Sequence, residues 1–317
     1  MSGSVDVSVV LATHDRPERL ERQLACLRGQ SLADDRYEVI VVDDASGRAT
    51  VDLLARERAR ASGPRLTVIR RDVSGGPAAA RNQGWRAARA ALVAFTDDDC
   101  EAPPQWLEAG LAAARARPGA FIQGPIGPIP REAADYGPFS HTVDVAELGP
   151  GFETANIFYP RALLERLGGF DEVAYTGPGG EDTDLAWKAL EQGVEAVWAP
   201  DAQMHHAVTA LGPVGKLRMA ARWHESMLPF KRYAALRRHR RYGVFWNDTH
   251  VWLFRAALAL LVPRRFWWLR WWLAAPYVMR LTNRRSGPLL APYLIVHDLV
   301  EVTACVRGSI RYRVLVI

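Results

Sequence analysis

Short apolar runs alternate with longer amphipathic stretches over the first hundred residues. Val7 to Thr13 and residues 38–42 are β-branched runs typical of buried strands, and between them Leu20, Leu24 and Leu27 recur at helical spacing. The same alternation continues over a helix at about 50–61, a strand at 66–70, an alanine-rich helix at 78–90 and a strand at 92–96. Strands that alternate with helices predict a mostly parallel sheet covered by helices.

The middle of the chain has a less regular pattern. Residues 119–150 are rich in Gly and Pro, and we interpret them as loops and edge structure. The later elements that we predict are strand, turn and helix within 154–168, a Gly-rich loop at 176–180, a helix at 181–192 and a strand at 194–198. The predicted α/β domain covers residues 1–212.

After Pro213 the chain becomes basic and rich in tryptophan. Residues 1–212 hold 21 basic and 31 acidic side chains, whereas residues 213–290 hold 16 and 2, so the overall net charge of +5 hides a strong division. Seven of the 11 tryptophans lie in this later part. We therefore predict a second, mainly helical region over residues 213–317 that contacts a polyanionic surface.

The aromatic run at residues 266–272 indicates what that surface is. It combines four tryptophans with Arg270, a composition that suits the headgroup layer of an anionic membrane. No uninterrupted apolar run reaches about 18 to 20 residues, so we expect no spanning helix. The alternative is a helical subdomain that packs on the body or on a second subunit, as a homodimer. No recognisable nucleic-acid module is present, and we expect no nucleic-acid partner.

Composition and cysteine usage narrow the class of protein. With 49% hydrophobic and 24% charged residues, the chain is globular rather than disordered or fibrous. Cys26, Cys100 and Cys305 are far apart, which indicates neither a disulfide framework nor a thiolate metal site. The N-terminus lacks the pattern of a signal peptide. We expect a cytoplasmic protein, peripheral at the inner face of the cell membrane.

Three acidic residues, Asp97, Asp98 and Asp99, directly follow the strand at 92–96. Carboxylates crowded this closely repel one another unless a cation neutralises them, so they indicate a divalent metal site. Taken alone, the run also fits a solvated turn. The pair His205 and His206 follows a short strand, and either imidazole would complete a Mn²⁺ or Mg²⁺ shell.

A second acidic group, Glu181, Asp182 and Asp184, opens the helix at 181–192 behind the Gly-rich loop. Asp182 would serve as a carboxylate base for a hydroxyl nucleophile, or it would simply cap the helix. Arg81, at the start of the alanine-rich helix, would face a phosphate, or it would be an ordinary surface arginine.

Seven ordered motifs between about residues 5 and 206 carry a family resemblance. They are V-S-V-V-L-A-T-H-D-R-P, V-V-D-D-A-S, G-G-P-A-A-A-R-N-Q-G-W, F-T-D-D-D, A-N-I-F-Y-P-R, G-G-F-D-E and G-E-D-T-D-L-A-W-K-A. Together they closely resemble family 2 of the inverting glycosyltransferases. Two departures from the family pattern are His14, where the family often has Tyr, and Lys188, where it often has Arg.

The resemblance implies a GT-A fold, which is a Rossmann-like mixed sheet flanked by helices, and a nucleoside-diphosphate sugar as the donor. It also implies roles for residues of this chain: Asp182 as catalytic base; Asp99 and His206 as metal ligands; Ala12, His14, Asp44, Arg81, Asp97 and Asp98 on the donor; Asn156, Glu181 and Trp187 on the acceptor side.

The function that follows is metal-dependent inverting transfer of a sugar to a hydroxyl of a saccharide or lipid-linked acceptor, in cell-surface polysaccharide or glycolipid synthesis. The metal and Arg81 would neutralise the departing diphosphate while Asp182 takes the hydroxyl proton. Two other classes remain open from the residues alone. One is a catalytically silent nucleotide-sugar-binding scaffold on the same fold, and the other is a nucleotidyltransferase.

Overall fold

The computed structural model describes residues 5–282 and 287–317, which divide into two compact units. Unit 1 comprises Met1–Ala134 and Thr142–Val208, and unit 2 comprises Asp135–His141 and Thr209–Ile317. Residues 135–141 join unit 2 because β8 (Ser140–His141) pairs with β12 (Thr209–Ala210).

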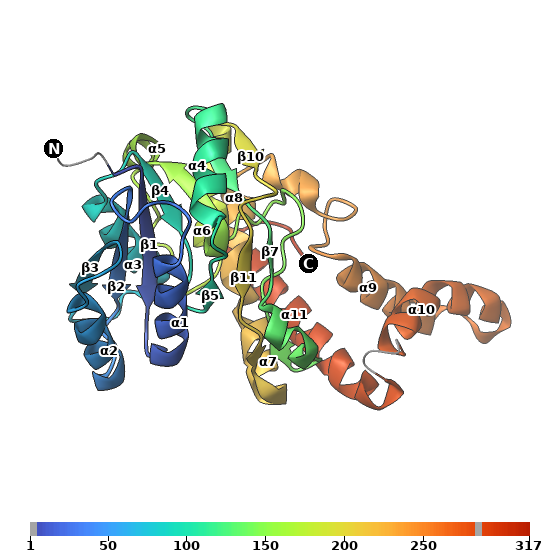
Figure 1. Cartoon of the computed structure of the whole chain (residues 1–317). Helices are drawn as coiled ribbons and strands as arrows, with labels where there is room; N and C mark the ends of the chain where they lie inside the picture. The colour runs from blue at the N-terminus through green and yellow to red at the C-terminus, as the bar shows by residue number, and fades with distance from the viewer. Residues whose placement is uncertain (1–4, 283–286) are drawn as a thin grey trace. The chain divides into compact units, whose positions relative to one another are not determined.

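Unit 1 is built on a mixed sheet with the strand order β10-β6-β9-β4-β1-β2-β3 (Figure 1). Its strands are β1 (Val7–Thr13), β2 (Tyr37–Asp43), β3 (Arg65–Arg70), β4 (Leu92–Phe95), β6 (Phe121–Gln123), β9 (Ile157–Pro160) and β10 (Ala196–Trp198). The pairs among β1, β2, β3 and β4 are parallel, and β9 runs antiparallel to both of its neighbours. A smaller sheet has the order β5-β11-β7, from β5 (Cys100–Glu101), β7 (Ile126–Pro128) and β11 (Met204–His206).

Alternate residues of the buried strands point to opposite faces of the large sheet. Both faces therefore present apolar side chains, and helices cover both. Val9 and Leu11 pack in one core cluster with Leu24 of α1. Val10 points the other way, and a Cβ added to Gly84 of α3 would lie 2.4 Å from its side chain, so this helix sits directly on β1. The helices of unit 1 are α1 (Pro17–Arg28), α2 (Arg48–Arg58), α3 (Gly76–Ala87), α4 (Trp106–Ala116), α5 (Arg161–Leu167) and α6 (Glu181–Glu191).

One part of the sequence interpretation is wrong. We expected loops and edge structure over 119–150, but β6 is a fully buried strand inside the large sheet. Three residues bounded by Gly and Pro are too few to show a period, which is why the pattern does not reveal this strand. The strand at 194–198 is confirmed as β10.

Unit 2 is mainly helical over its described residues. Its helices are α7 (Gly212–Ala221), α8 (Leu228–Arg232), α9 (Asp248–Leu261), α10 (Trp267–Leu281) and α11 (Ala291–Tyr312), with the 3₁₀ segment η3 (Arg222–Met227). α9 packs against α10, and α11 packs against α7 and η3. A Cβ on Gly308 would lie 2.4 Å from the carbonyl oxygen of His224, so only glycine permits this approach of α11 to η3.

The expectation of no membrane-spanning helix stays a prediction, although one helix of unit 2 is long and apolar enough to span. By length and composition, Pro288–Tyr312 qualifies, with a mean hydropathy of 1.6. Asp298 and Glu301 interrupt the apolar pattern of the sequence, but they do not interrupt the helix. Length and composition alone do not establish that this helix crosses a membrane.

Candidate active site

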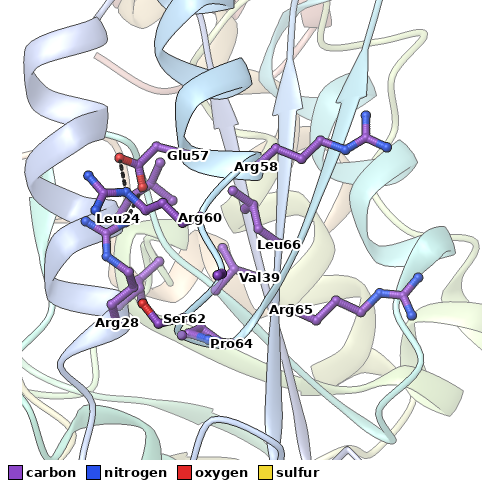
Figure 2. Close-up of a pocket in the computed structure, with 13 residues that line it drawn as sticks. Leu24, Arg28, Val39, Glu57, Arg58, Arg60, Ser62, Pro64, Arg65 and Leu66 are labelled. Carbon is purple, nitrogen blue, oxygen red and sulfur yellow. Dashed lines mark hydrogen bonds and ion pairs between the residues drawn. The ribbon is translucent and has the colours of Figure 1, made fainter.

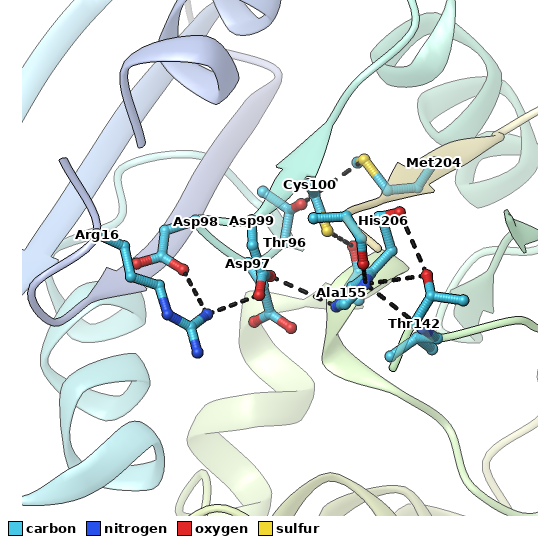
Figure 3. Close-up of polar contacts among 12 residues, drawn as sticks. Arg16, Thr96, Asp97, Asp98, Asp99, Cys100, Thr142, Ala155, Met204 and His206 are labelled. Atoms are coloured by element: carbon cyan, nitrogen blue, oxygen red, sulfur yellow. Dashed lines mark hydrogen bonds and ion pairs between the residues drawn. The ribbon is translucent and has the colours of Figure 1, made fainter. Parts of the chain in front are cut away.

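The carboxyl ends of β1, β2 and β4 bring the first group of predicted residues together. These strands are parallel neighbours, so Thr13, Asp44 and Asp97 to Asp99 emerge at one edge of the sheet. The Thr13 hydroxyl donates a hydrogen bond of 2.7 Å to Oδ2 of Asp98. Arg16 places Nη1 2.6 Å from Oδ2 of Asp99 and 3.3 Å from Oδ1 of Asp98 (Figure 3).

Asp98 is nearly enclosed among these groups. Burial raises its pKa to about 7, and the negative charge of Asp99 adds to the shift, while Arg16 and the Thr13 hydroxyl oppose it. Arg16 and Thr13 were not among the predicted site residues. Both lie in the run T-H-D-R at the end of β1. An arginine just after a strand whose neighbour ends in acidic residues was the available signal.

Asp99 lies beside His206. The antiparallel pairing of β5 with β11 sets His206 opposite Cys100, and Nε2 of His206 is 3.5 Å from Oδ1 of Asp99. On the other side of the ring, Nδ1 lies 2.9 Å from the Ala207 carbonyl oxygen, so a proton on Nδ1 leaves the Nε2 lone pair directed at Asp99.

Strand alternation distinguishes the two adjacent histidines. His205 pairs opposite Glu101 on β5, and its side chain points to the opposite face of β11 from His206. Burial lowers the pKa of His205, against the charge of Glu101. Of the pair, His206 is therefore the histidine beside Asp99.

Arg81 links the aspartate run to the start of α6. Its Nη2 lies 2.7 Å from Oδ1 of Asp97, and its Nη1 lies 2.9 Å from Oε1 of Glu181. The guanidinium is almost completely buried and sits 5.9 Å from the ring centre of Phe170. Burial lowers the pKa of Arg81, but the two carboxylates outweigh this and hold the pKa above its usual value. Arg81 is thus a buried ion-paired bridge rather than an exposed arginine.

Asp182 begins the first turn of α6. Gly180, with a φ of 95°, is the residue before this helix, a left-handed conformation that glycine adopts without strain. Glu181 accepts a hydrogen bond from the Gly179 N–H at 2.8 Å, which fixes the loop. Burial raises the pKa of Asp182, and the carboxylates of Glu181 and Glu153 raise it further. Glu153 was not among the predicted residues, and nothing in its local pattern marks it.

Asp44 holds the glycine loop before α3. Its carboxylate accepts hydrogen bonds from the Ser74 hydroxyl at 2.6 Å and from the N–H groups of Gly75 and Gly76 at 3.0 Å each. Burial raises the pKa of Asp44, but these bonds and the charge of Arg71 lower it more. Asp44 therefore holds this loop in place at the carboxyl edge of the sheet. The Asp44 carbonyl oxygen also lies 2.7 Å from Nδ1 of the exposed His14.

The three residues predicted on the acceptor side hold backbone segments. Asn156 is buried, accepts a hydrogen bond from the Trp106 indole at 2.8 Å and donates to the carbonyl oxygens of Pro125 and Ala202. The Trp187 indole donates to the Pro150 carbonyl oxygen at 3.0 Å, and Glu181 is paired with Arg81. Contact with an acceptor stays a prediction for these residues. Ala12 is half-buried near the end of β1, and its contact with a donor also stays a prediction.

Two pockets flank this sheet. One of about 180 Å³ is lined by Arg28, Arg58 and Arg65 together with Glu57, which Arg28 and Arg60 neutralise (Figure 2). It lies where α1 and α2 end and β3 begins, which is the edge opposite the aspartates. The other, of about 550 Å³, lies beside the loop that Asp44 holds, and it is lined by Arg71, Ser74, Gly75, Ala79, Gln83, Arg86, Glu172 and Thr176.

Comparison with known families gives two overlapping matches. Residues 8–170 match the family described as Glycosyl transferase family 2, and residues 92–299 match Glycosyl transferase family group 2. The first match covers the aspartate run, and the second extends from it into the helical unit.

Curated relatives are similar at moderate identity. A validoxylamine A glucosyltransferase of Streptomyces hygroscopicus subsp. limoneus is 30% identical over 268 residues, covering 70% of this chain and 58% of that protein. Glycosyltransferase AglE of Haloferax volcanii is 25% identical over 309 residues, covering 94% of this chain and 92% of that protein. The chain spans about three fifths of the length of the validoxylamine A enzymes.

Solved structures share the fold. The mannosyltransferase PcManGT from Pyrobaculum calidifontis, in complex with GDP-Man and Mn²⁺, superposes with a TM-score of 0.62 at 21% identity, over 97% of this chain and 88% of that chain. S. aureus TarS 1-349 in complex with UDP gives 0.55 at 19% identity, over 97% and 91%. The likeness confirms the predicted GT-A arrangement of a mixed sheet flanked by helices.

Proposed function

Because the chain belongs to glycosyl transferase family 2, we propose that it transfers a sugar from a nucleoside-diphosphate sugar to an acceptor hydroxyl, with a divalent cation and inversion at the anomeric carbon. The observation that carries the proposal is the convergence of Asp99 and His206, 3.5 Å apart, at the same sheet edge as Asp97 and Asp98. Arg81 ties this edge to the first turn of α6, which bears Asp182.

The side-chain atoms of Asp99 and His206 suit a divalent cation. Asp99 offers a carboxylate oxygen and His206 an imidazole nitrogen, a combination that Mn²⁺ accepts, and Mg²⁺ would depend more on the carboxylate. When bound, the cation would supply positive charge against the developing charge of the departing nucleoside diphosphate. Asp98 and Arg16 lie next to these ligands and add further polar groups to the same edge of the sheet.

Asp182 is the base in this proposal. The acceptor oxygen forms a bond to the anomeric carbon as the bond from that carbon to the diphosphate oxygen breaks, and the hydroxyl proton moves to the Asp182 carboxylate. Burial raises the pKa of Asp182, and Glu181 and Glu153 raise it further, which makes its ionised form a stronger base. One displacement from the face opposite the leaving group inverts the anomeric configuration.

The proposed acceptor is a saccharide or a lipid-linked saccharide used in cell-surface polysaccharide or glycolipid synthesis. Support comes from α10, whose Trp267, Trp268, Trp271 and Trp272 are 59% to 66% exposed. The spacing of these residues sets two pairs one turn apart on the helix. Exposed tryptophans within a strongly basic unit favour contact with an anionic membrane, peripheral at its cytoplasmic face, over a second subunit.

The test is a screen of nucleoside-diphosphate sugars by thermal shift, each with Mn²⁺, with Mg²⁺ and with chelator, followed by release of nucleoside diphosphate from the stabilising donor. Ligand that binds the folded chain raises its melting temperature by mass action. We expect one donor to stabilise the chain only when cation is present, and to be consumed. Stabilisation without consumption in the presence of any acceptor would instead support a silent binding protein.

A further inference from the structure

One face of α11 gathers three potential ligand side chains within unit 2. His297, Asp298 and Glu301 each offer an atom within 4.8 Å of the others. Nδ1 of His297 lies 4.0 Å from Oε2 of Glu301, since the two residues are one helical turn apart, and 3.5 Å from Oδ1 of Asp298. Clusters of this kind are common without a bound ion, so a metal site here requires a further ligand from the neighbouring helix α9.

His250 of α9 points into this cluster. Its side chain is 0% exposed, and neither ring nitrogen has a hydrogen-bond partner among the described residues. Nε2 lies 3.8 Å from Oε2 of Glu301, beyond hydrogen-bonding distance but suited to sharing a cation. A buried imidazole without hydrogen bonds is costly, and most buried polar groups avoid this state.

The groups around these side chains hold them in place. Asn247, the cap of α9, accepts a hydrogen bond from the His250 N–H at 3.0 Å and places Nδ2 3.4 Å from Oε1 of Glu301. Oε2 of Glu301 therefore remains directed at the two histidines. Burial lowers the pKa of Lys216, against the charge of Glu301. The Lys216 ammonium donates a hydrogen bond to the Ser140 carbonyl oxygen at 2.8 Å.

Asp298 supports the cluster. Arg280 donates to both of its carboxylate oxygens, at 2.8 and 2.9 Å, and the Tyr277 hydroxyl donates at 2.9 Å. These hydrogen bonds hold the Asp298 carboxylate against α10, so we leave it out of the ligand set. The remaining set is Nε2 of His250, Nδ1 of His297 and Oε2 of Glu301.

We propose that these three atoms bind one Zn²⁺ that joins α9 to α11, at a site separate from Asp99 and His206. Two imidazole nitrogens and one carboxylate oxygen are a zinc ligand set, whereas Mg²⁺ and Ca²⁺ prefer oxygen alone. Ligand bonds of about 2.0 to 2.2 Å in tetrahedral geometry place ligand atoms roughly 3.3 to 3.6 Å apart. Oε2 of Glu301 lies 3.8 Å from Nε2 of His250 and 4.0 Å from Nδ1 of His297, so both imidazoles would move toward Glu301 to bind the ion. The metal would fasten α9, and with it the tryptophan-bearing α10, to α11.

The experiment uses the untagged full chain, stripped of metal by chelator and titrated with ZnCl₂ against a chromophoric competitor. We expect one tightly bound Zn²⁺ per chain that persists in His206→Ala and weakens at least tenfold in His250→Ala and in Glu301→Gln. Glu301→Gln keeps the side-chain shape, and circular dichroism confirms that each variant is folded. The paired control His224→Ala with Glu225→Gln removes the same residue types from η3 and should leave Zn²⁺ binding unchanged.

A second measurement is independent of any variant. Co²⁺ substituted into the wild-type chain should show the intense visible absorption of a four-coordinate site, and Zn²⁺ should raise the melting temperature. Equal zinc affinity in Glu301→Gln and the wild type, or loss of the tight Zn²⁺ in His206→Ala, would overturn the proposal. So would a melting temperature that Zn²⁺ leaves unchanged, because His250 and Glu301 would then form only a buried ion pair.

Discussion

His206 directs Nε2 at Oδ1 of Asp99, 3.5 Å away, although 107 positions of sequence separate them. The register of β11 against β5 and β7 creates this pairing, since β11 runs antiparallel to the strand that follows Asp99. An oxygen and a nitrogen ligand brought together by strand pairing are held by backbone hydrogen bonds rather than by flexible loops. This rigidity is what a catalytic metal site needs.

Replacing either member of the pair should weaken cation-dependent donor binding. Asp99→Asn and His206→Ala each remove a proposed ligand, so we expect the affinity for the stabilising nucleotide in Mn²⁺ to fall by about 10- to 100-fold or more. Isothermal titration calorimetry with and without Mn²⁺ measures this directly. His205→Ala is the matched control, because alternation along β11 turns that side chain to the other face, and its affinity should match the wild type. Equal losses in His205→Ala and His206→Ala would refute the assignment.

Arg81 should contribute mainly to stability. Arg81→Met leaves Glu181 buried without its ion pair, and we expect the free energy of unfolding to drop by about 3 to 5 kcal/mol. Urea denaturation followed by tryptophan fluorescence measures the change. Arg86→Ala, an exposed arginine on the same helix, is expected to stay within about 0.5 kcal/mol. A stable Arg81→Met with normal donor affinity would show that the bridge matters little.

The pH dependence of transfer should report Asp182. Its carboxylate acts as base only when ionised, so the rate rises as pH rises through its pKa, which burial, Glu181 and Glu153 hold above the usual value. Glu153→Gln removes one negative neighbour and should lower that pKa, which moves the acidic limb of the kcat profile to lower pH. Glu147→Gln, on an exposed stretch nearby, should leave the limb in place. A limb that does not move in Glu153→Gln would argue that another group controls it.

Membrane binding should depend on the arginines that precede α10. Arg264→Glu with Arg265→Glu reverses two charges, and at about 1 kcal/mol per basic residue the loss exceeds about tenfold in partitioning to anionic vesicles. Flotation with anionic and neutral vesicles measures it, with Arg115→Glu and Arg117→Glu on unit 1 as the control.

Two other results bear on the C-terminal region. Absence of vesicle binding together with a dimer by light scattering would favour a subunit interface. Resistance to alkaline extraction would favour a helix that spans the bilayer, for which Pro288–Tyr312 has the length.

The sequence predicts the strands that carry the site better than it predicts the contacts within it. The apolar runs at residues 7–13, 38–42 and 92–96 predict three strands, and the structure confirms them as β1, β2 and β4. The choice between His205 and His206 needs the register of β11, which is a long-range pairing that no local pattern contains.

Long-range partners explain the remaining differences. Arg81 reads locally as a helix-surface residue, but Asp97 and Glu181 enclose it from two distant segments. The donor contact of Asp44 stays a prediction, and the structure adds that its oxygens accept hydrogen bonds from the loop at Ser74 to Gly76. Sequence motifs thus locate the sheet edge where the acidic residues gather, while the contacts that each residue makes there depend on tertiary packing.

The most direct test of the proposed chemistry is turnover by Asp182→Asn. With the stabilising donor, an acceptor and Mn²⁺, we measure formation of nucleoside diphosphate and of glycosylated product, alongside nucleotide affinity. We expect the rate to fall by about 100- to 10,000-fold, the range that general-base catalysis supplies, while nucleotide affinity stays within a few-fold of the wild type. Near-native turnover by Asp182→Asn would contradict the account, because the acceptor proton would then leave by another route.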